Sequence, residues 1–156
     1  SIIDFNIAEI FLKKNENTIF NYFINFSFID SKYTNSKEPG VEGKKVEFIP
    51  KVNLKTGTKI GFKDFMFGFQ YTYLSDQFTD SSNAINSNLS GVIGIIPQYD
   101  VFDISTSYSL KEFKFESGIN NLFNKKYFTR RATGYPGPGI IPSSPRTLYF
   151  TIQYKK

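Results

Sequence analysis

The chain has 156 residues, a formal net charge of +5, and neither cysteine nor histidine. This composition excludes a disulfide scaffold, a thiolate metal site and any catalytic step that needs a thiol or an imidazole. Aromatic residues make up 18% of the chain, with 18 Phe and 10 Tyr, and this content favours strands over helices. The longest apolar runs span only a few residues, too few for a helix that crosses a bilayer.

Apolar and polar side chains alternate along most of the chain, which predicts strands with one apolar face. The clearest case is residues 64–76, where one face carries only aromatic side chains: Phe65, Phe67, Phe69, Tyr71 and Tyr73. Taken in chain order, the pattern predicts seven strands, at residues 2–12, 18–31, 50–61, 64–76, 99–110, 113–123 and 146–155.

A row of lysines at positions 51, 55, 59 and 63 has a spacing that would also suit one face of a helix. The residues between them, Thr56, Gly57 and Thr58, are poor helix formers. We therefore expect a strand whose lysines share one solvated face, where they could also ease the passage of an anion.

The connections between the predicted strands alternate between short and long. Residues 13–17, 61–63 and 111–112 are short, whereas the long connections are 32–49, 77–98 and 124–145. Short turns at one end and long loops at the other, with strands of about 10 residues, are typical of transmembrane β-barrels. The alternative is a soluble β-sandwich that buries its aromatic faces between two sheets.

The composition of the two faces favours the barrel, because the polar face is rich in Asn, Gln, Ser, Thr, Gly and Lys, as a water-filled lumen requires. We expect an open, curved sheet in which all neighbouring strands are antiparallel. Its convex side should carry Phe20, Tyr22, Phe65, Phe67, Phe69, Phe102, Ile104, Phe150 and Ile152. Its concave side should carry Asn25, Gln70, Ser105 and Thr151.

Residues 118–127 read Gly-Ile-Asn-Asn-Leu-Phe-Asn-Lys-Lys-Tyr. They resemble the penultimate strand of TonB-dependent outer-membrane receptors, where Gly-x-x-Asn-Leu-Phe-Asp/Asn-x-x-Tyr precedes the last extracellular loop. The Gly/Pro-rich residues 134–146 that follow resemble the corresponding loop of receptors of the ferric-dicitrate transport type. Residues 46–51 and 73–80 are similar to further strand-to-loop segments of this group, so the resemblance covers nearly the whole chain.

The resemblance implies an all-β fold: an antiparallel up-and-down sheet of about seven strands, the C-terminal fragment of a barrel of about 22 strands. Residues 1–156 would be a partial barrel without its plug domain. The implied localisation is the outer membrane of a Gram-negative bacterium, with multiple membrane crossings. One departure from the family is the end of the chain, where Tyr154 is followed by Lys155 and Lys156, while such barrels usually end in an aromatic residue.

The implied function is receptor-mediated, energy-dependent uptake of an iron chelate, such as ferric citrate or a siderophore, or of a similar nutrient. The alternative is a soluble β-sandwich binding or adhesin module. The implied partners are outer-membrane lipid and lipopolysaccharide, the iron chelate, and the energy-coupling TonB complex, reached through the missing plug. We expect no nucleic-acid partner, because lysines and aromatics lie on opposite strand faces, whereas stacking platforms need both on one surface.

Arg130 and Arg131 are the candidate ligand-binding residues, because guanidinium groups suit the carboxylates of an anionic chelate. The alternative is that they pair with loop acids or with lipopolysaccharide phosphates. Loop structure is the role expected of Gly134, Pro136, Gly137, Pro138 and Gly139, which combine stiff positions with positions open to positive φ. Such a loop could also be a cap without ligand contact. Arg146, at the start of the last strand, is expected to be structural.

The sequence shows no arrangement that predicts an enzyme, a cofactor or a metal centre. Asp100 and Asp103 fall on opposite faces of their predicted strand, so they cannot act as a carboxylate pair. A calcium site built from Asp76, Asp80, Asn83 and Asn86 is a minor alternative, because such sites need a denser cluster of oxygens.

Overall fold

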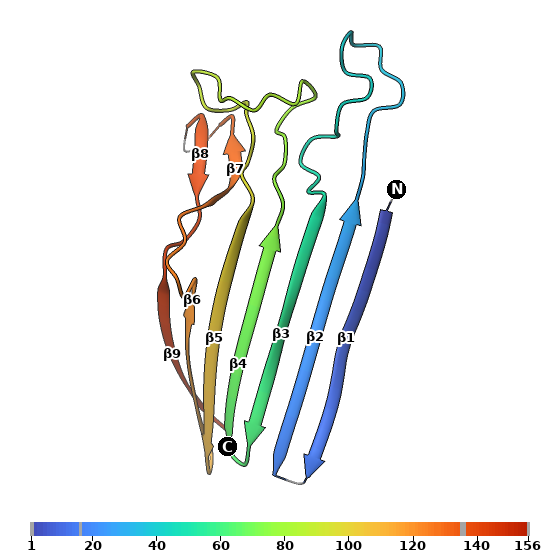
Figure 1. The fold of residues 1–156 in the computed structure, drawn as a ribbon. Helices are drawn as coiled ribbons and strands as arrows, with labels where there is room; N and C mark the ends of the chain where they lie inside the picture. Colours follow the sequence, from blue (N-terminus) through green and yellow to red (C-terminus); the bar gives the residue numbers. More distant parts are fainter. Residues whose placement is uncertain (1, 16, 135–136, 156) are drawn as a thin grey trace.

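The computed structural model describes residues 2–15, 17–134 and 137–155, with the backbone alone for residues 2 and 4–15. Seven strands form one sheet in the order β1-β2-β3-β4-β5-β6-β9 (Figure 1). Their bounds are β1 Ile2–Asn15, β2 Thr18–Ile29, β3 Val52–Phe62, β4 Phe65–Leu74, β5 Tyr99–Leu110, β6 Phe113–Asn120 and β9 Thr147–Tyr154. All neighbouring pairs are antiparallel, which confirms the predicted up-and-down topology and all seven predicted strands.

The two ends of the sheet differ as the connection lengths predict. At the turn end, β3 joins β4 through Lys63 and Asp64, and β5 joins β6 through Lys111 and Glu112. Lys63 and Lys111 have φ values of 53° and 52°, the left-handed conformation that two-residue hairpin turns require. At the opposite end, called the loop end below, lie all three long connections (Figure 1).

The last long connection is not an irregular loop, and here the sequence prediction was incomplete. Residues Phe128–Ala132 form β7 and Gly139–Pro142 form β8, which pair as a separate two-stranded antiparallel sheet. This hairpin stands at the loop end, between β6 and β9 in the chain (Figure 1). The predicted strand at 113–123 therefore ends earlier, at Asn120, because Asn121 turns the chain with a φ of 53°.

The register aligns the apolar positions of neighbouring strands on one face of the sheet, the apolar face. Phe20 pairs with Ile60, Ile60 with Phe67, and Phe67 with Thr106. Farther along, Tyr108 pairs with Phe115 and Phe115 with Ile152. The nine residues predicted for the convex side all fall on this face, and the four predicted for the concave side fall on the other, the polar face.

No second layer covers the apolar face in the part of the chain that the structure describes. Leu148, Phe150 and Ile152 of β9 are 73%, 66% and 57% exposed, and Phe65 of β4 is 46% exposed. The small β7-β8 sheet lies at the loop end and does not stack on this face (Figure 1). The structure therefore does not favour the β-sandwich alternative, because the described residues form no second sheet against this face.

The polar face is hollowed, as expected for a concave side. A single hollow of about 420 Å³ is lined by Lys59 of β3, Gly68 of β4, Ser105 of β5, Glu116 of β6 and Tyr149 of β9. Within the described residues, no helix has the length and apolar character needed to cross a membrane.

Fully packed side chains concentrate in the connections rather than in the sheet. The buried apolar residues are Val41, Ile96 and Ala132 in the long connections and Val101 in β5. A one-layer sheet has no interior, so packing at the loop end is what this segment can bury by itself.

Candidate functional site

The base of the last connection is built around two asparagines. Asn121, 4% exposed, accepts a hydrogen bond at Oδ1 from the Lys125 amide (2.7 Å) and donates from Nδ2 to the carbonyls of Lys125 (2.9 Å) and Ser144 (3.3 Å). Its own amide donates to Asp103 Oδ1 on β5 at 2.8 Å. Asn124 accepts from the Arg146 amide at 3.0 Å.

Both asparagines have positive φ, 53° at Asn121 and 54° at Asn124. Asparagine tolerates this conformation better than most residues and offers both a donor and an acceptor. Asn121 and Asn124, two of the three asparagines in the motif at 118–127, therefore join the start of the connection to its end.

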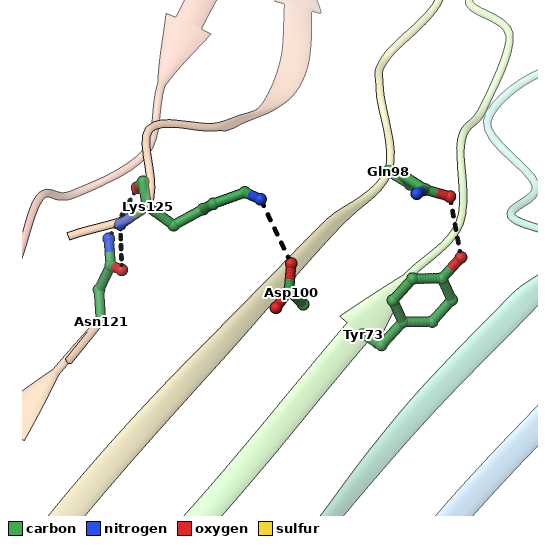
Figure 2. Close-up of polar contacts among 5 residues, drawn as sticks. All are labelled: Tyr73, Gln98, Asp100, Asn121 and Lys125. Carbon is green, nitrogen blue, oxygen red and sulfur yellow. Dashed lines mark hydrogen bonds and ion pairs between the residues drawn. The ribbon is translucent and has the colours of Figure 1, made fainter. Parts of the chain in front are cut away.

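The rim beside this base is held by contacts between connection residues and strand ends (Figure 2). Lys125 lies over Asp100 with Nζ 3.4 Å from Oδ1, and the hydroxyl of Tyr73 donates to Gln98 Oε1 at 3.0 Å. The Tyr127 ring stacks on Tyr99, with centroids 4.4 Å apart. These aromatic and charged side chains mark the boundary between sheet and loops.

Arg130 and Arg131 both lie on β7 at the loop end, on the side expected for an extracellular loop, but their surroundings differ. Arg131 Nη1 donates to the Gly91 carbonyl at 2.7 Å, while Nη2 and Nε donate to the Ile95 carbonyl at 2.9 and 3.3 Å. Its guanidinium carbon lies 5.1 Å from the centroid of the Phe128 ring. Arg130 is exposed, and no hydrogen bond or ion pair joins its guanidinium to another described residue.

The other residues predicted to shape the loop differ in their backbone conformation and contacts. Gly137 and Gly139 have φ values of 150° and 130°, whereas Gly134 has no positive φ and accepts the Gly137 amide at 2.6 Å. Pro138 is exposed. The Arg146 amide donates to Asn124 Oδ1, and Pro136 lies outside the described residues.

The long connections also fasten one another. Asn83 accepts from the Lys45 amide at 2.7 Å and donates to the Lys45 carbonyl at 2.8 Å, which joins the 77–98 connection to the 32–49 connection. Thr79 makes a reciprocal pair with Gly94, accepting its amide at 3.0 Å and donating to its carbonyl at 2.8 Å. In the minor calcium alternative Asn83 was a ligand, but both ends of its carboxamide are used here.

Tyr33 provides a further bond in the 32–49 connection, because its hydroxyl donates to Glu47 Oε2 at 2.6 Å. This hydrogen bond raises the pKa of Tyr33, and partial burial and the negative charge of Glu47 act in the same direction. The described residues contain no group of three or more Asp, Glu, His or Cys side chains arranged to hold a metal ion.

The lysines at positions 51, 55, 59 and 63 lie in different surroundings. Lys55 and Lys59 lie on the polar face, in register with Asn25 and Asn21. The ammonium of Lys51, before β3, is 5.3 Å from the Phe28 ring centroid, and that of Lys63, after β3, is 5.5 Å from the Phe62 ring. Phe28 and Phe62 belong to the apolar face, while Lys63 also lines the hollow of the polar face together with Lys59.

Sequence reasoning missed the β7-β8 hairpin and the side-chain hydrogen bonds that Asn83, Asn121 and Arg131 make to backbone groups. A signal for the hairpin was present, because β-branched Thr129, Ile140 and Ile141 flank a Gly/Pro-rich centre. The bonds from Asn83 to Lys45, from Arg131 to Gly91 and Ile95, and from Asn121 to Ser144 left no such local signal, because they join groups that are distant in the sequence.

Comparison with known families gives one match over most of the chain. The family model described as TonB dependent receptor-like, beta-barrel, matches residues 3–122.

Several solved structures share this fold. The ferric citrate transporter FecA, in its unliganded form, matches with a TM-score of 0.77 and 22% identity over 86% of this chain and 21% of that chain. The ferric yersiniabactin uptake receptor FyuA from Yersinia pestis matches with a TM-score of 0.72 and 17% identity, over 94% of this chain and 22% of that one. The copper transporter OprC matches with a TM-score of 0.62 and 16% identity over 92% and 22%.

The chain spans about a fifth of the length of these proteins. At these identities the likeness establishes the fold alone. By their names, these three proteins carry ferric citrate, ferric yersiniabactin and copper, so one fold serves chemically different ligands.

Proposed function

The chain belongs to the TonB-dependent receptor β-barrel family, and from this premise we propose that it is the C-terminal part of a receptor for energy-dependent uptake of an iron chelate. Barrels of this family lie in the outer membrane of Gram-negative bacteria. The strands of the sheet are accordingly membrane crossings, the loop end faces outwards, and the turn end faces the periplasm.

The observation that carries the proposal is the division of the sheet into two faces. A wide, uncovered apolar face suits lipid, and a concave face lined by Lys59, Ser105 and Glu116 suits a water-filled lumen. The three long connections at the loop end, residues 32–49, 77–98 and 124–145, form what we call the outer cap. A membrane-embedded polar lumen under this folded cap is an arrangement for binding and passage. The named matches, which are receptors and transporters, support the same function.

The ligand we propose is anionic, of the ferric citrate or carboxylate-siderophore class. Arg130 and Arg131 place two guanidinium charges on one strand of the outer cap, and the partners of Arg131 are neutral carbonyls that leave its charge uncompensated. Arg130 has exposed donors for a carboxylate. A positive cap concentrates an anionic ligand at the mouth of the lumen.

The proposed partners follow from the same architecture. Lipid and lipopolysaccharide would contact the apolar face and its rim. A plug domain outside residues 1–156 would fill the lumen and connect the receptor to the TonB complex.

The test is uptake of radioactive iron by a Gram-negative host that lacks its own iron-chelate receptors and carries the full-length protein. We expect saturable uptake of ferric citrate that disappears when the TonB gene is deleted. Uptake of a catecholate or hydroxamate chelate alone would keep the receptor function and overturn the carboxylate assignment. If normal surface expression gives no uptake of any iron chelate, the proposed function is wrong.

A further inference from the structure

The two adjacent arginines of β7 lie in different surroundings. Successive residues of a strand point to opposite sides, so Arg131 points to the 77–98 connection and Arg130 points away from it. Three donor nitrogens of Arg131 are occupied by the carbonyls of Gly91 and Ile95. A side chain held in this way is a poor candidate for direct ligand contact.

The contact that Arg131 secures is an unusually close approach of two backbones. A Cβ built on Gly91 would lie 3.2 Å from the Cα of Gly139 in β8. Within the 77–98 connection itself, a Cβ on Gly94 would lie 2.9 Å from the Cα of Ser87, and it would also lie 3.3 Å from Arg131 Nη2. With so few side chains between the two segments, the guanidinium provides their main polar connection.

The neighbouring packing supports the same conclusion. Ala132, which follows Arg131, is 5% exposed, and Ile96, which follows the carbonyl acceptor Ile95, is 1% exposed. Ile96 and Gln77 exchange two backbone hydrogen bonds, at 2.8 and 3.0 Å, which hold the two ends of the 77–98 connection together. The segment that accepts the hydrogen bonds of Arg131 is therefore a fixed structure rather than a free loop.

We propose that Arg131 is a positioning residue that latches the β7-β8 hairpin onto the 77–98 connection and thereby orients Arg130 toward the ligand. The orientation of Arg130 toward ligand rests on the proposed function, whereas the latch does not. Loss of Arg131 leaves two carbonyls without their donor and frees the hairpin to move. Arg130 is then present but no longer held in place.

The first measurement tests the latch without any ligand. In the full-length receptor, any cysteines outside these residues are replaced by serine, and Leu89→Cys and Ile140→Cys introduce spin labels at positions that are 110% and 53% exposed. Electron paramagnetic resonance then gives the distance distribution between the two labels. We expect one narrow distribution in the parent receptor.

The variants separate a latch from a general effect of lost charge. Arg131→Ala should broaden the distribution, and the matched control Arg130→Ala, one residue away on the other side of β7, should leave it narrow. Arg131→Lys keeps the charge but has no planar fork to bridge two carbonyls, so it should also broaden it. A narrow distribution in Arg131→Ala would overturn the latch.

The second measurement asks whether Arg131 acts through Arg130, with ferric citrate as the probe and binding measured on whole cells at matched surface expression. Arg130→Ala should weaken binding about tenfold or more. The double variant, with Arg130→Ala and Arg131→Ala, should bind ferric citrate no more weakly than Arg130→Ala alone. If the affinity losses of the two single variants add up in the double variant, the positioning role is overturned and Arg131 has its own ligand contact. Broadening by Arg131→Ala together with unchanged binding in Arg130→Ala would support the latch and remove the ligand role of Arg130.

Discussion

At the scale of single residues, the motif asparagines act through both their backbone conformation and their side chains. Asn121 is nearly buried, has positive φ and bonds to three separate backbone groups. Its role in the family motif can therefore be explained without ligand contact. It closes the base of the connection that carries the arginines.

Two substitutions separate the contributions of Asn121. Asn121→Gly removes the side-chain bonds but keeps the freedom to adopt positive φ, while Asn121→Ala loses both. We expect both to destabilise the full-length receptor and alanine to cost about 1 kcal/mol more than glycine. Urea unfolding in lipid vesicles measures the difference. Equal stabilities would show that the backbone conformation contributes nothing.

Two glycines of the polar face each lie beneath an aromatic side chain of the neighbouring strand. A Cβ on Gly118 would lie 2.5 Å from the Tyr149 hydroxyl oxygen, an atom at the end of a side chain that can rotate. A Cβ on Gly57 would lie 2.7 Å from the Phe23 ring and also 2.6 Å from the carbonyl oxygen of Phe69, a backbone atom that cannot.

This difference predicts an order of stability. Gly57→Ala should cost about 1–3 kcal/mol, the usual range for overpacking, and Gly118→Ala should cost less. The same urea unfolding experiment compares the two. A larger loss at Gly118 would mean that the Tyr149 ring is fixed in place by contacts outside this segment.

Tyr33 gives the 32–49 connection a defined response to pH. The hydroxyl donates to Glu47 only while protonated, so the pKa of Tyr33 lies above the ordinary tyrosine value of about 10. The stabilisation is fully present below that ordinary value and is lost as pH rises through the raised pKa. The difference between the ultraviolet titrations of the parent receptor and Tyr33→Phe isolates this tyrosine. A midpoint at or below the ordinary value would contradict the bond.

At the scale of elements, each strand has one lipid-facing and one lumenal side, and β4 offers a matched pair of positions. Phe69 lies on the apolar face opposite Ile104, and the next residue, Gln70, lies on the polar face opposite Asp103. Both are near the middle of β4. Their neighbours in the full barrel should therefore be lipid tails for Phe69 and water or plug for Gln70.

Lysine substitutions at these two positions test that assignment. Phe69→Lys should destabilise the receptor by about 2–4 kcal/mol, the cost of a cation at the bilayer midplane. Gln70→Lys should be tolerated, because it places the cation beside Asp103, whose Oδ2 already accepts a hydrogen bond from Gln70 at 3.3 Å. Surface amount and resistance to unfolding in detergent report the difference. Equal effects would mean that the faces are assigned wrongly.

Elements were predictable from sequence where a strand has a strict two-residue period. Phe65, Phe67 and Phe69 determine the faces of β4, and a slip of one residue would move all three into the lumen. The β7 and β8 strands have five and four residues, too few for such a period to appear. Their place against the 77–98 connection depends on Arg131 and on the close backbone approach at Gly91, which are tertiary contacts invisible to a local pattern.

At the scale of the whole molecule, the sheet is incomplete in two ways. Within the described chain β1 and β9 each pair on one side only, and the apolar face has no cover. Both deficits are met by a closed barrel in a membrane, because further strands pair the edges and lipid covers the face.

The final prediction concerns residues 1–156 produced alone. The edges leave backbone donors and acceptors unpaired, and side chains such as Leu148, Phe150 and Ile152 are exposed on one edge strand. Such a strand is a template for association with other copies. We therefore expect the segment to be insoluble in buffer and to enter solution only with detergent, where circular dichroism should show β-structure. A matched variant with Leu148→Thr, Phe150→Thr and Ile152→Thr removes the apolar side chains but leaves the edges open, so it should aggregate less without becoming monomeric. If the parent segment were monomeric in buffer, its apolar face would have to be covered by its own residues, and the assignment of that face to lipid would fail.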